Sequence, residues 1–450
     1  MIRLMRKKKH KNLIHLSKNE KKHFKHISCY FSYTTFAQSK CGVVFQDSLN
    51  QTINQKWLQQ KSNFEYQVQQ YTSALKASRT TAYQTIRIPV VVHVIHNTAS
   101  KIIGGTNNIN ISDEQILSQI QTLNEDYRKK EGTAGYNTNP VGADMQIEFF
   151  LADSTATGET TKGITRHYTT KTGFDIIKEL GAITAFSKWN PYKYLNIYVV
   201  KSGTTSTPLT IGYSGFPFDA YLPGLIPNTS EAAEQQIFDG VVIDYRYFGR
   251  CCGTISTTYN MGRTTTHEVG HWLGLLHPTG DVRCGTDYCD DTPTIESLNN
   301  GFTCNKMTST CDGNTVTNQI ENYMDYSPDV CMSLFTNDQK IRTRAALELS
   351  YRRKSLVNNS TVVSESNALQ VSIDPNPVKS SANIKVQFSG TENITIQLIS
   401  ENGNTLNEYN YQNVTSNYFL MNTSSYANGM YFLRVNTSKE TKVVRMFVLK

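Results

Sequence analysis

Three histidines and a glutamate lie within one short stretch, HEVGHWLGLLH, as His267, Glu268, His271 and His277. His267 and His271 are four positions apart, so on a helix both imidazoles project from one face and can chelate a zinc ion. His277 lies six residues beyond His271, where an unbroken helix would carry it well off that face. Gly274 stands where a left-handed residue would end the helix and bring His277 back. The spacing therefore predicts a zinc site with three histidine ligands.

A site of this kind predicts hydrolysis of peptide bonds. Three neutral ligands leave Zn²⁺ with its full charge and one open position for water. That charge lowers the pKa of the water toward about 7, which makes a nucleophile at neutral pH. Glu268 follows the first ligand directly, so its carboxylate can take the water proton and pass it to the leaving amine. A helix that carries two surface histidines by chance is the weaker interpretation, because the stretch uses three of the six histidines after residue 40.

The extended motif resembles the signature of the metzincin metalloproteases. The resemblance implies a tight turn with a methionine beneath the metal, and Met324, in the segment IENYMDYSPDVCMSLF, matches that methionine. Its thioether would form an apolar floor rather than act as a ligand. Tyr326 matches a tyrosine that in several metzincins stabilises the oxyanion of the tetrahedral intermediate. A core aromatic is the alternative role for Tyr326.

Among metzincins, residues 86–345 resemble the pappalysin family in its bacterial cytophagalysin branch. The matching segments are IPVVVHVIH, ISDEQILSQIQTLNEDYR, GITRH, YLNIYVV, GRTTTHEVGHWLGLLH, DDTP and NYMDYSPDVCMSLFTNDQ. They span a whole catalytic domain. The resemblance implies an α/β metzincin-type fold, with a twisted and mostly parallel sheet, a backing helix and an active-site helix.

Seven of the nine cysteines fall within residues 251–331. This density in an exported chain favours disulfides over a zinc ribbon, whose repeated CxxC pairs are missing. The family resemblance implies one disulfide between Cys284 and Cys311 and another between Cys304 and Cys331. The second would hold the loop that carries the methionine turn.

Three other cysteines lie outside that family pattern. Cys289 occupies a position that is usually apolar in the family, and Cys251 and Cys252 are adjacent. Because adjacent cysteines rarely bond to each other, we expect one of them to pair with Cys289.

The resemblance also implies a structural calcium ion in the loop after the third histidine. Asp287 and Thr292 match that region and Asp290 lies nearby. Oxygen ligands suit Ca²⁺. The alternative is a solvated acidic turn.

Asp329 follows the methionine turn and matches an acidic position in relatives that cleave before basic residues. A carboxylate at the floor of a pocket would favour Arg or Lys after the scissile bond. An exposed loop acid is the alternative. The substrate main chain is expected to add as a strand to the sheet edge near residues 211–214.

The elements that must position these residues are visible in the sequence pattern. Residues 85–95 are a β-branched run and predict a buried strand. Ser112 is expected to cap a helix, with Gln115 three positions on, and apolar residues follow at helical spacing. Further strands are predicted at residues 145–151, 195–200 and 240–243. Strands before and after a long helix predict an α/β sheet domain, which we place at residues 85–350.

The basic residues are concentrated at the N-terminus. The formal net charge is +8, but residues 1–40 hold 11 Lys and Arg against one acid, and the rest holds 34 against 36. A nucleic-acid-binding body is therefore excluded, and no apolar stretch is long enough for a transmembrane helix. Residues 1–38 have the basic, apolar and small-residue order of a signal peptide, with a disordered basic tail or a start codon upstream of the true one as the alternatives.

Residues 39–84 are polar, rich in glutamine and predicted to be helical near 48–73, and we interpret them as a pro-segment. Cys41 stands in Lys-Cys-Gly-Val, which resembles the cysteine-switch motifs of latent metzincins. Its thiolate would be a fourth zinc ligand and displace the catalytic water. A free or disulfide-bonded cysteine is the alternative.

The last part of the chain has a different character. Residues 351–368 lack a core pattern and are interpreted as a linker. Residues 369–450 show short alternating strands between turns, which predicts a small all-β sandwich. They resemble the type IX secretion sorting domain, which implies export through the periplasm and outer membrane to the medium or the cell surface. A sugar-binding or adhesion sandwich is the alternative.

The function predicted from the sequence is that of a secreted zinc-dependent endopeptidase acting on protein and peptide substrates. A catalytically inactive metzincin that serves as a surface adhesin or binding module is the alternative. The intact Glu268 argues against it.

Overall fold

The computed structural model describes most of the chain from residue 39 onward. The described ranges are 39–44, 57–78, 83–203, 209–217, 238–299, 301–360, 369–388, 392–414 and 417–450. The predicted leader and the first part of the predicted pro-segment helix lie outside these residues. No described helix has the length and apolar character that crossing a bilayer requires.

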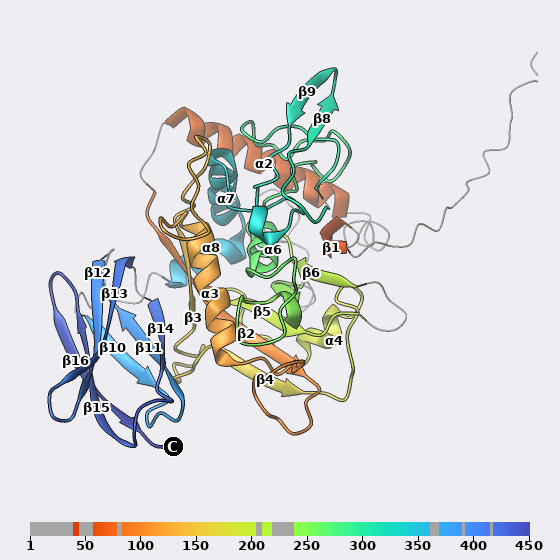
Figure 1. Ribbon diagram of the computed structural model, residues 1–450. Helices are drawn as coiled ribbons and strands as arrows, with labels where there is room; N and C mark the ends of the chain where they lie inside the picture. Colours follow the sequence, from red (N-terminus) through yellow and green to blue (C-terminus); the bar gives the residue numbers. More distant parts are fainter. Residues whose placement is uncertain are drawn as a thin grey trace, which may run out of the picture. The chain divides into compact units, whose positions relative to one another are not determined.

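One mixed sheet organises the first part of the described chain (Figure 1). Its strand order is β1-β6-β7-β5-β2-β3, and β4 also pairs with β2. The strands are β1 (Ser39–Cys41), β2 (Ile86–His96), β3 (Ile147–Leu151), β4 (Ile164–Tyr168), β5 (Leu195–Val200), β6 (Thr210–Ser214) and β7 (Val241–Asp244). All pairings are parallel except that between β6 and β7. The predicted α/β fold with a mostly parallel sheet is confirmed.

The long strand β2 pairs with two shorter strands in succession. Its first half runs beside β3 and its second half beside β4, while its other edge pairs with β5. From Ile88 onward β2 is fully buried, and all six residues of β5 are buried as well. Strands covered on both faces need no polar alternation, which explains their continuous apolar sequences.

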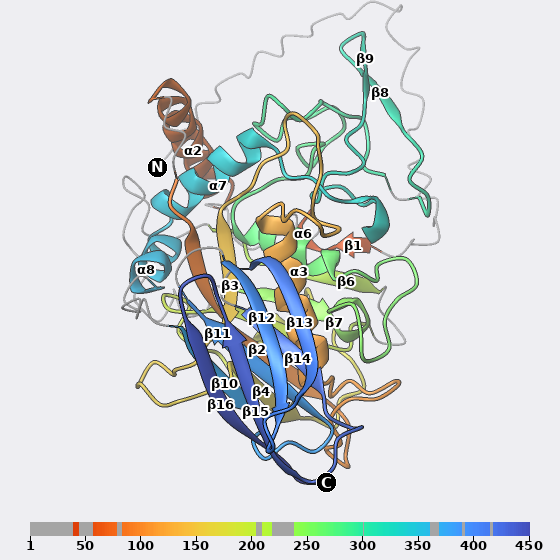
Figure 2. The same ribbon diagram turned by 60° about the vertical axis from the view of Figure 1, so that its left-hand side comes forward.

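Helices α3 (Asp113–Tyr127) and α6 (Arg263–Trp272) cover one face of the sheet, and Figures 1 and 2 both show α3 alongside it. The Ser112 side chain accepts a hydrogen bond from the Gln115 N–H, which confirms the predicted cap. The apolar stripe of α3 packs into the main core with β2, β5 and β7. The backing helix and the active-site helix therefore share one core.

The opposite face of the sheet has a second, smaller core. Phe174, Ile177 and Ile183 pack there against Tyr198 and Val242 of the central strands. Ile183 belongs to the short helix α4 (Leu180–Thr184). The sheet is thus enclosed on both sides.

Helices α7 (Asn337–Leu349) and α8 (Tyr351–Ser360) complete the catalytic part. Helix α2 (Trp57–Ser78) of the predicted pro-segment lies against α7 (Figure 2). Phe64 and Val68 of α2 are buried there with Ala345 and Ala346.

The linker predicted at residues 351–368 is wrong over its first ten residues, which form α8. Leu356 of α8 is fully buried, and Arg352 and Arg353 are buried beside Asp239. The sequence of this segment suggests exposure to solvent because it contains two arginines. Their acidic partner, Asp239, lies more than 100 residues earlier in the chain, so the pairing could not be predicted locally.

The C-terminal part consists of two antiparallel sheets, as predicted for a β-sandwich. One has the order β10-β11-β14 and the other β13-β12-β15-β16. The strands are β10 (Gln370–Asp374), β11 (Ser381–Gln387), β12 (Glu392–Ser400), β13 (Thr405–Val414), β14 (Asn417–Asn422), β15 (Gly429–Asn436) and β16 (Thr441–Val448). Their inward apolar residues form a core of their own.

The disulfides follow the family pattern with one exception. Cys284 is bonded to Cys311 and Cys304 to Cys331, the pairings that the resemblance implies. Cys311 ends β8 (Thr308–Cys311), which forms a hairpin with β9 (Asn314–Thr317), and Cys331 ends the 3₁₀ helix η2 (Asp329–Cys331).

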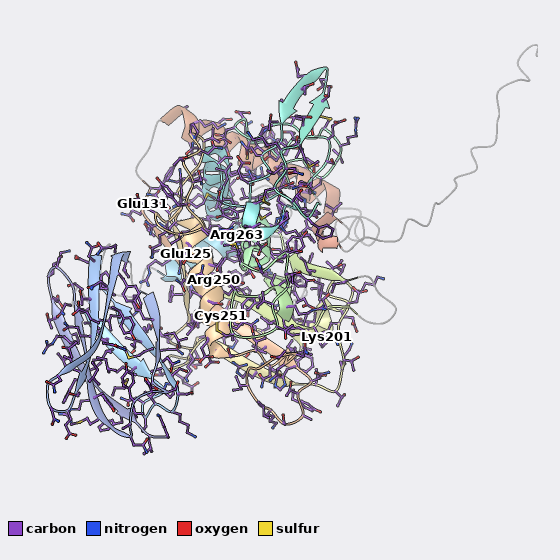
Figure 3. All side chains as sticks on the ribbon, viewed as in Figure 1. Glu125, Glu131, Lys201, Arg250, Cys251 and Arg263 are labelled. Atoms are coloured by element: carbon purple, nitrogen blue, oxygen red, sulfur yellow. A yellow bond between two sulfur atoms is a disulfide. The ribbon has the colours of Figure 1, made fainter. Side chains whose placement is uncertain are left out.

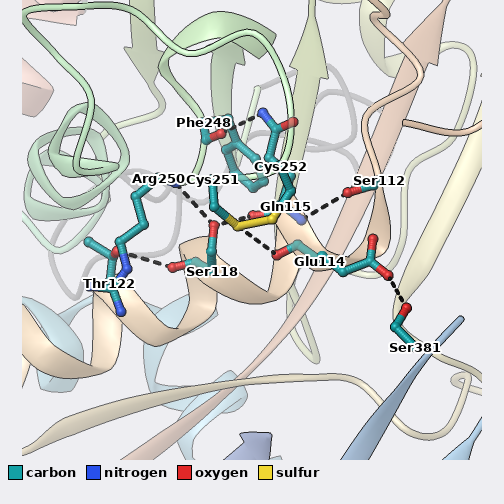
Figure 4. Close-up of a disulfide and its surroundings, with 10 residues drawn as sticks. All are labelled: Ser112, Glu114, Gln115, Ser118, Thr122, Phe248, Arg250, Cys251, Cys252 and Ser381. Carbon is teal, nitrogen blue, oxygen red and sulfur yellow. Dashed lines mark hydrogen bonds between the residues drawn. A yellow bond between two sulfur atoms is a disulfide. The ribbon is translucent and has the colours of Figure 1, made fainter. Parts of the chain in front are cut away.

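The pairing expected between Cys289 and one of the two adjacent cysteines is wrong. Cys251 and Cys252 are bonded to each other (Figure 4). Cys289 is a buried thiol. The chain turns sharply here, with positive φ at Gly249 and Cys252, which brings neighbouring sulfurs together. Cys251 Sγ lies 4.0 Å from the carbonyl oxygen of Glu114 at the start of α3.

Candidate active site

Glycines flank helix α6: Gly262 precedes its first residue, and Gly274 lies two residues after its last. At the start, Gly262 is left-handed and the carboxylate of Asp329 accepts a hydrogen bond from the Arg263 N–H. At the end, Gly274 has a φ of +91°. Its N–H bonds to His271 O and the Leu275 N–H to Gly270 O, which is a Schellman motif. The predicted helix stop at Gly274 is therefore present.

This helix stop brings the three histidines to one point. The Nε2 atoms of His267, His271 and His277 lie 3.1, 3.2 and 3.3 Å from one another. In a tetrahedral zinc site, Zn–N bonds of about 2.0–2.1 Å place two nitrogens about 3.3 Å apart. All three rings are fully buried. The donor set and its spacing fit a zinc ion.

Each histidine uses its second ring nitrogen for a protein contact. Nδ1 of His267 lies 2.8 Å from Tyr323 O, and Nδ1 of His271 lies 2.8 Å from Leu275 O. Nδ1 of His277 lies 2.5 Å from the carboxylate of Asp281. Such contacts place the proton on Nδ1 and leave Nε2 as the ligand atom.

Burial further favours the neutral rings. It lowers the pKa of His267 well below its usual value and that of His271 to about 3, with the neighbouring histidines acting in the same direction. Both rings are thus unprotonated at neutral pH, as metal ligation requires.

Glu268 lies beside this cluster and is fully buried. Burial raises the pKa of its carboxyl group to about 8. Its Oε2 accepts a hydrogen bond from Cys41 Sγ at 3.5 Å, and its Oε1 has no partner among the described residues. The carboxylate therefore keeps one oxygen for a small molecule at the histidines.

The residues matched to the methionine turn lie next to the histidines. Met324 is fully buried, and its Sδ takes the space that a side chain at Gly270 would need, 2.4 Å from where that Cβ would be. The ring centroid of Tyr326 lies 5.7 Å from that of His267 and 5.1 Å from that of His277.

A buried aspartate of α3 joins these parts, and sequence reasoning missed it. Asp126 accepts hydrogen bonds from Tyr323 Oη and Thr266 Oγ1, both at 2.8 Å, and pairs with Arg263 at 3.5 Å. Burial raises its pKa to about 6. The sequence signal that could have found Asp126 is its position directly before Tyr127, a residue of the predicted buried face of α3.

A largely buried ion pair also joins α3 to the neighbouring turn. Arg250 binds Glu125 through two hydrogen bonds of 2.5 and 2.8 Å, and Figure 3 shows the pair beside Arg263. The Arg250 N–H also donates to Ser118 Oγ (Figure 4). These contacts connect the start of the turn that carries Cys251 to α3.

Strand β1 brings Cys41 to the histidines. The sulfur of Cys41 and the three Nε2 atoms all lie within 4.8 Å of one another. Within the described residues, this is the one group of three or more His, Cys, Asp or Glu side chains that could hold a metal ion. Cys41 pairs with Gly212 of β6, so β1 covers the edge at residues 211–214 where a substrate strand was expected.

Asp329, the predicted pocket acid, is fully buried. Its Oδ2 accepts hydrogen bonds from the N–H groups of Met261 and Arg263, and its Oδ1 has no partner among the described residues. The exposed loop acid considered as an alternative does not describe this residue. Oδ2 therefore fixes the start of α6.

The three residues considered for calcium do not converge. Asp287 is buried with its Oδ2 unpartnered, and the Thr292 hydroxyl is also buried without a hydrogen-bond partner among the described residues. Burial raises the pKa of Asp287 to about 7. The carboxylate of Asp290 instead is exposed and pairs with Lys76 of α2 at 2.9 Å.

Two family models match the chain. The pregnancy-associated plasma protein-A model matches residues 182–348, and the secretion system C-terminal sorting domain model matches residues 372–450. A protein of Colletotrichum graminicola described as an extracellular metalloprotease is 30% identical over 311 residues, covering 69% of this chain and 90% of the relative. A Sordaria macrospora protein of the same description is 36% identical over 152 residues, or 34% of this chain and 47% of the relative.

Solved structures give the same result. A mutant of Tannerella forsythia promirolysin is 34% identical with a TM-score of 0.57, and the match covers 72% of this chain and 98% of that one. Mirolysin in complex with a small compound is 38% identical with a TM-score of 0.50, covering 61% and 96%. Relatives that are named as proteases do not favour an inactive adhesin. The chain belongs to the pregnancy-associated plasma protein-A (pappalysin) family and is a secreted zinc metalloprotease with a C-terminal secretion sorting domain.

Proposed function

We propose that His267, His271 and His277 hold the catalytic zinc ion and that Glu268 is the general base of peptide-bond hydrolysis. The observation that carries this is the convergence of three buried Nε2 atoms beside a buried carboxylate. Bound zinc supplies a Lewis acid that polarises the scissile carbonyl and acidifies a water. Glu268 takes the water proton at its unpartnered Oε1 and returns it to the leaving nitrogen.

Tyr326 is proposed to stabilise the oxygen that becomes negative during the reaction. Burial raises the pKa of its phenol well above the usual value, so the hydroxyl stays protonated and can donate. Met324 packs under the histidines at Gly270 and supports their positions without contacting the substrate.

The overall activity is tested on protein from which residues 1–84 have been removed. We expect it to cleave a denatured proteome, and a zinc chelator should stop the cleavage. Cleavage that persists after zinc removal would reject the proposal.

The role of Glu268 is tested by Glu268→Gln. We expect cleavage to fall by about 10²- to 10⁴-fold, the usual contribution of a positioned base, with the zinc content unchanged. Normal turnover with bound zinc would refute this role.

We propose that Asp329 gives the enzyme a preference for Arg or Lys after the scissile bond. Its buried Oδ1 is unpartnered, and a cation beside it would be strongly favoured. Sequencing of new N-termini should show Arg and Lys enriched in the first position. Termini without this enrichment would reject the preference while leaving the catalytic proposal intact.

We propose that residues 39–84 are a pro-segment that keeps the enzyme latent, with Cys41 as a fourth zinc ligand. The sulfur is within 4.8 Å of all three Nε2 atoms. Burial raises the pKa of the thiol, so a thiolate there needs a cation beside it. The intact chain should be far less active than the trimmed chain, and Cys41→Ser should narrow the difference. Equal activity of both chains would reject latency.

A structural calcium ion is proposed at Asp287 and Thr292, without Asp290. Two buried, unpartnered oxygens and a carboxylate whose pKa is raised by burial support it. Added Ca²⁺ should raise the unfolding temperature of the wild type but not of Asp287→Asn. An equal response of both proteins would reject this site.

The C-terminal sandwich is proposed to engage the type IX secretion machinery. The sorting-domain match at residues 372–450 supports this partner. Deletion of residues 369–450 should leave the folded protein in the periplasm of its host. Unchanged export of the shortened protein would reject the proposal.

A further inference from the structure

Lys40, the residue before Cys41, is buried in the latent chain. Its exposed fraction is 2%, which is rare for a lysine. Among the carboxylates around this ammonium group, Asp329 has the strongest electrostatic interaction with it. A charged side chain that is buried in this way must be held by specific acceptors.

The acceptors come from the loop that follows the methionine turn. Lys40 Nζ donates to Ser327 O at 3.0 Å and to Asp325 O at 3.5 Å, and lies 3.6 Å from Met332 Sδ. It also lies 4.9 Å from the ring centroid of Tyr259. Backbone carbonyls, a thioether and an aromatic face form a recess that fits the end of a cationic side chain.

The recess lies next to the histidines and holds the side chain of the residue that precedes Cys41. β1 lies on β6 with Ser39 opposite Thr210 and Cys41 opposite Gly212. The side chain of Cys41 reaches the three Nε2 atoms, and that of its neighbour Lys40 enters the recess. β1 runs parallel to β6, so Lys40 lies on the N-terminal side of Cys41. A peptide that runs in the opposite direction along β6, with its reacting carbonyl at the histidines, would place the side chain that follows this carbonyl at the same point.

We propose that Lys40 is an internal substitute for the basic side chain of the substrate, and that it fills the specificity recess of the latent enzyme. This inference rests on the proposed preference for basic residues. It assigns Asp325 and Ser327, through their carbonyl oxygens, together with Met332 and Tyr259, to the recognition of that side chain. Latency thus has a second contact besides the Cys41 sulfur.

Asp329 contributes charge to the recess rather than a direct bond to this lysine. Within the described residues, no hydrogen bond joins Nζ to its carboxylate, and Oδ1 remains unpartnered. The recess therefore tolerates either cationic side chain, and a longer arginine would approach that oxygen more closely.

The test uses the full chain with Cys41→Ser, in which the sulfur contact is absent, and two further variants at position 40. Lys40→Met keeps the length of the side chain but removes its charge, whereas Lys40→Arg keeps the charge. We expect Lys40→Met to raise the initial rate of peptide cleavage about tenfold or more, since hydrogen bonds to charged groups contribute at least this much. Lys40→Arg should stay as slow as the parent.

Lys76→Met is the matched control. Lys76 is also a pro-segment lysine, and its ion pairs with Asp290 and Asp338 are on the surface, where such pairs contribute little. Its rate should equal that of the parent. Mass measurement must show that every chain is intact during the assay.

A second measurement does not depend on the pro-segment. n-Butylammonium, the side-chain analogue of lysine, should compete with substrate in the trimmed enzyme, whereas n-butanol should not. Three results would overturn the inference. The cleavage rate of Lys40→Met could equal that of the parent, Lys40→Arg could raise the rate as much as Lys40→Met does, or n-butylammonium could fail to compete with the substrate. If the trimmed enzyme cleaves without a preference for basic residues, the proposed specificity is rejected together with the role of Lys40. If the preference is found but Lys40→Met does not raise the cleavage rate, only the role of Lys40 is rejected.

Discussion

Two glycines lack the side chain that would otherwise occupy the positions of the Glu268 carboxylate and the Met324 thioether. A Cβ built at Gly212 of β6 would be 2.6 Å from Oε1 of Glu268, and one at Gly270 would be 2.4 Å from Sδ of Met324. Neither distance is tolerated between real atoms, so a side chain at either position must displace its neighbour. In the sequence, Gly270 is only a small residue within the HEVGH motif. In the fold it is constrained by a methionine that lies far along the chain.

The first prediction concerns Gly212. We expect Gly212→Ala to lower kcat about tenfold or more, because the added methyl group displaces the Glu268 carboxylate. Zinc content should stay the same, since the three histidines are not touched. Peptide cleavage and metal analysis of the trimmed enzyme measure both effects. Gly181→Ala, where a Cβ would meet nothing within 4 Å, is the control and should keep full activity; an equally active Gly212→Ala would contradict the prediction.

The second prediction concerns the buried His93. Burial lowers its pKa to about 4, and its ring nitrogens contact Thr165 Oγ1 at 2.7 Å and Asn196 Oδ1 at 3.0 Å. The unfolded chain binds this proton near pH 6.5, so the unfolded state is favoured as the pH falls. The contribution is fully present above about pH 6.5, and roughly 3 kcal/mol of unfolding free energy should be lost by about pH 4.

This loss is measured by urea unfolding of the full chain between about pH 7 and about pH 4. His93→Gln removes the titrating group, so its unfolding free energy should depend less steeply on pH than that of the wild type. Parallel profiles for the two proteins would show that His93 does not carry this effect.

At the scale of elements, the geometry of the site depends on two contacts of α6. One is with α3, and the other is with the segment around the methionine turn. Asp126 of α3 binds Thr266 on α6 and Tyr323 before the methionine turn, and Asp329 binds the first N–H of α6. Both carboxylates are buried. Loss of one of these hydrogen bonds would leave a buried polar group without a partner, which destabilises the fold. The helix is therefore positioned by two acids that are not themselves part of the zinc site.

The third prediction compares the two long-range disulfides, which span the same sequence separation of 27 residues. Loop-closure entropy is then equal, and replacing either pair with serine should lower the unfolding free energy by about 3–4 kcal/mol. Only the pair of Cys304 and Cys331 holds the loop that ends at η2. Its removal should also lower kcat/KM, while removal of the other pair should leave it near the wild-type value.

Urea unfolding and peptide cleavage of the two double variants test this separation of stability from activity. An equal loss of kcat/KM in both variants would show that the loop with Cys331 has no special role in positioning the site.

Much of this element layout could be predicted from local sequence. The cap at Ser112, the strand Leu195–Val200 and the helix stop at Gly274 depend on neighbours along the chain, and the structure has all three. What could not be predicted depends on distant partners. Helix α8 is buried because Asp239 pairs with its arginines, and Asp126 matters because Tyr323 reaches it.

At the scale of the whole molecule, helix α2 of the proposed pro-segment makes extensive buried contact with the catalytic part. Glu65 of α2 forms a buried ion pair with Arg342 of α7 at 2.6 Å, and Phe64 is fully buried beside it. Arg342 also donates to Gly274 O at the end of α6. The pro-segment therefore contacts a residue that supports the active-site helix.

The fourth prediction concerns this ion pair. We expect Glu65→Gln to lower the unfolding free energy of the full chain by about 3–5 kcal/mol, because Arg342 is left buried without its charge partner. Lys76→Met, which removes surface ion pairs, should change it by about 1 kcal/mol at most. Urea unfolding of the full-length variants gives both values. Equal effects of the two substitutions would contradict the buried pair as a major contact.

The proposed blocking of the active site by β1 has a kinetic consequence, because β1 is part of the same polypeptide. A blocking segment on the same chain competes with substrate at a local concentration on the order of millimolar, so even a weak individual contact keeps the site closed. Once the chain is cut after β1, the freed segment competes only at the bulk concentration of the protein. A single cut would therefore activate the enzyme irreversibly, because the released segment becomes too dilute outside the cell to bind the active site again.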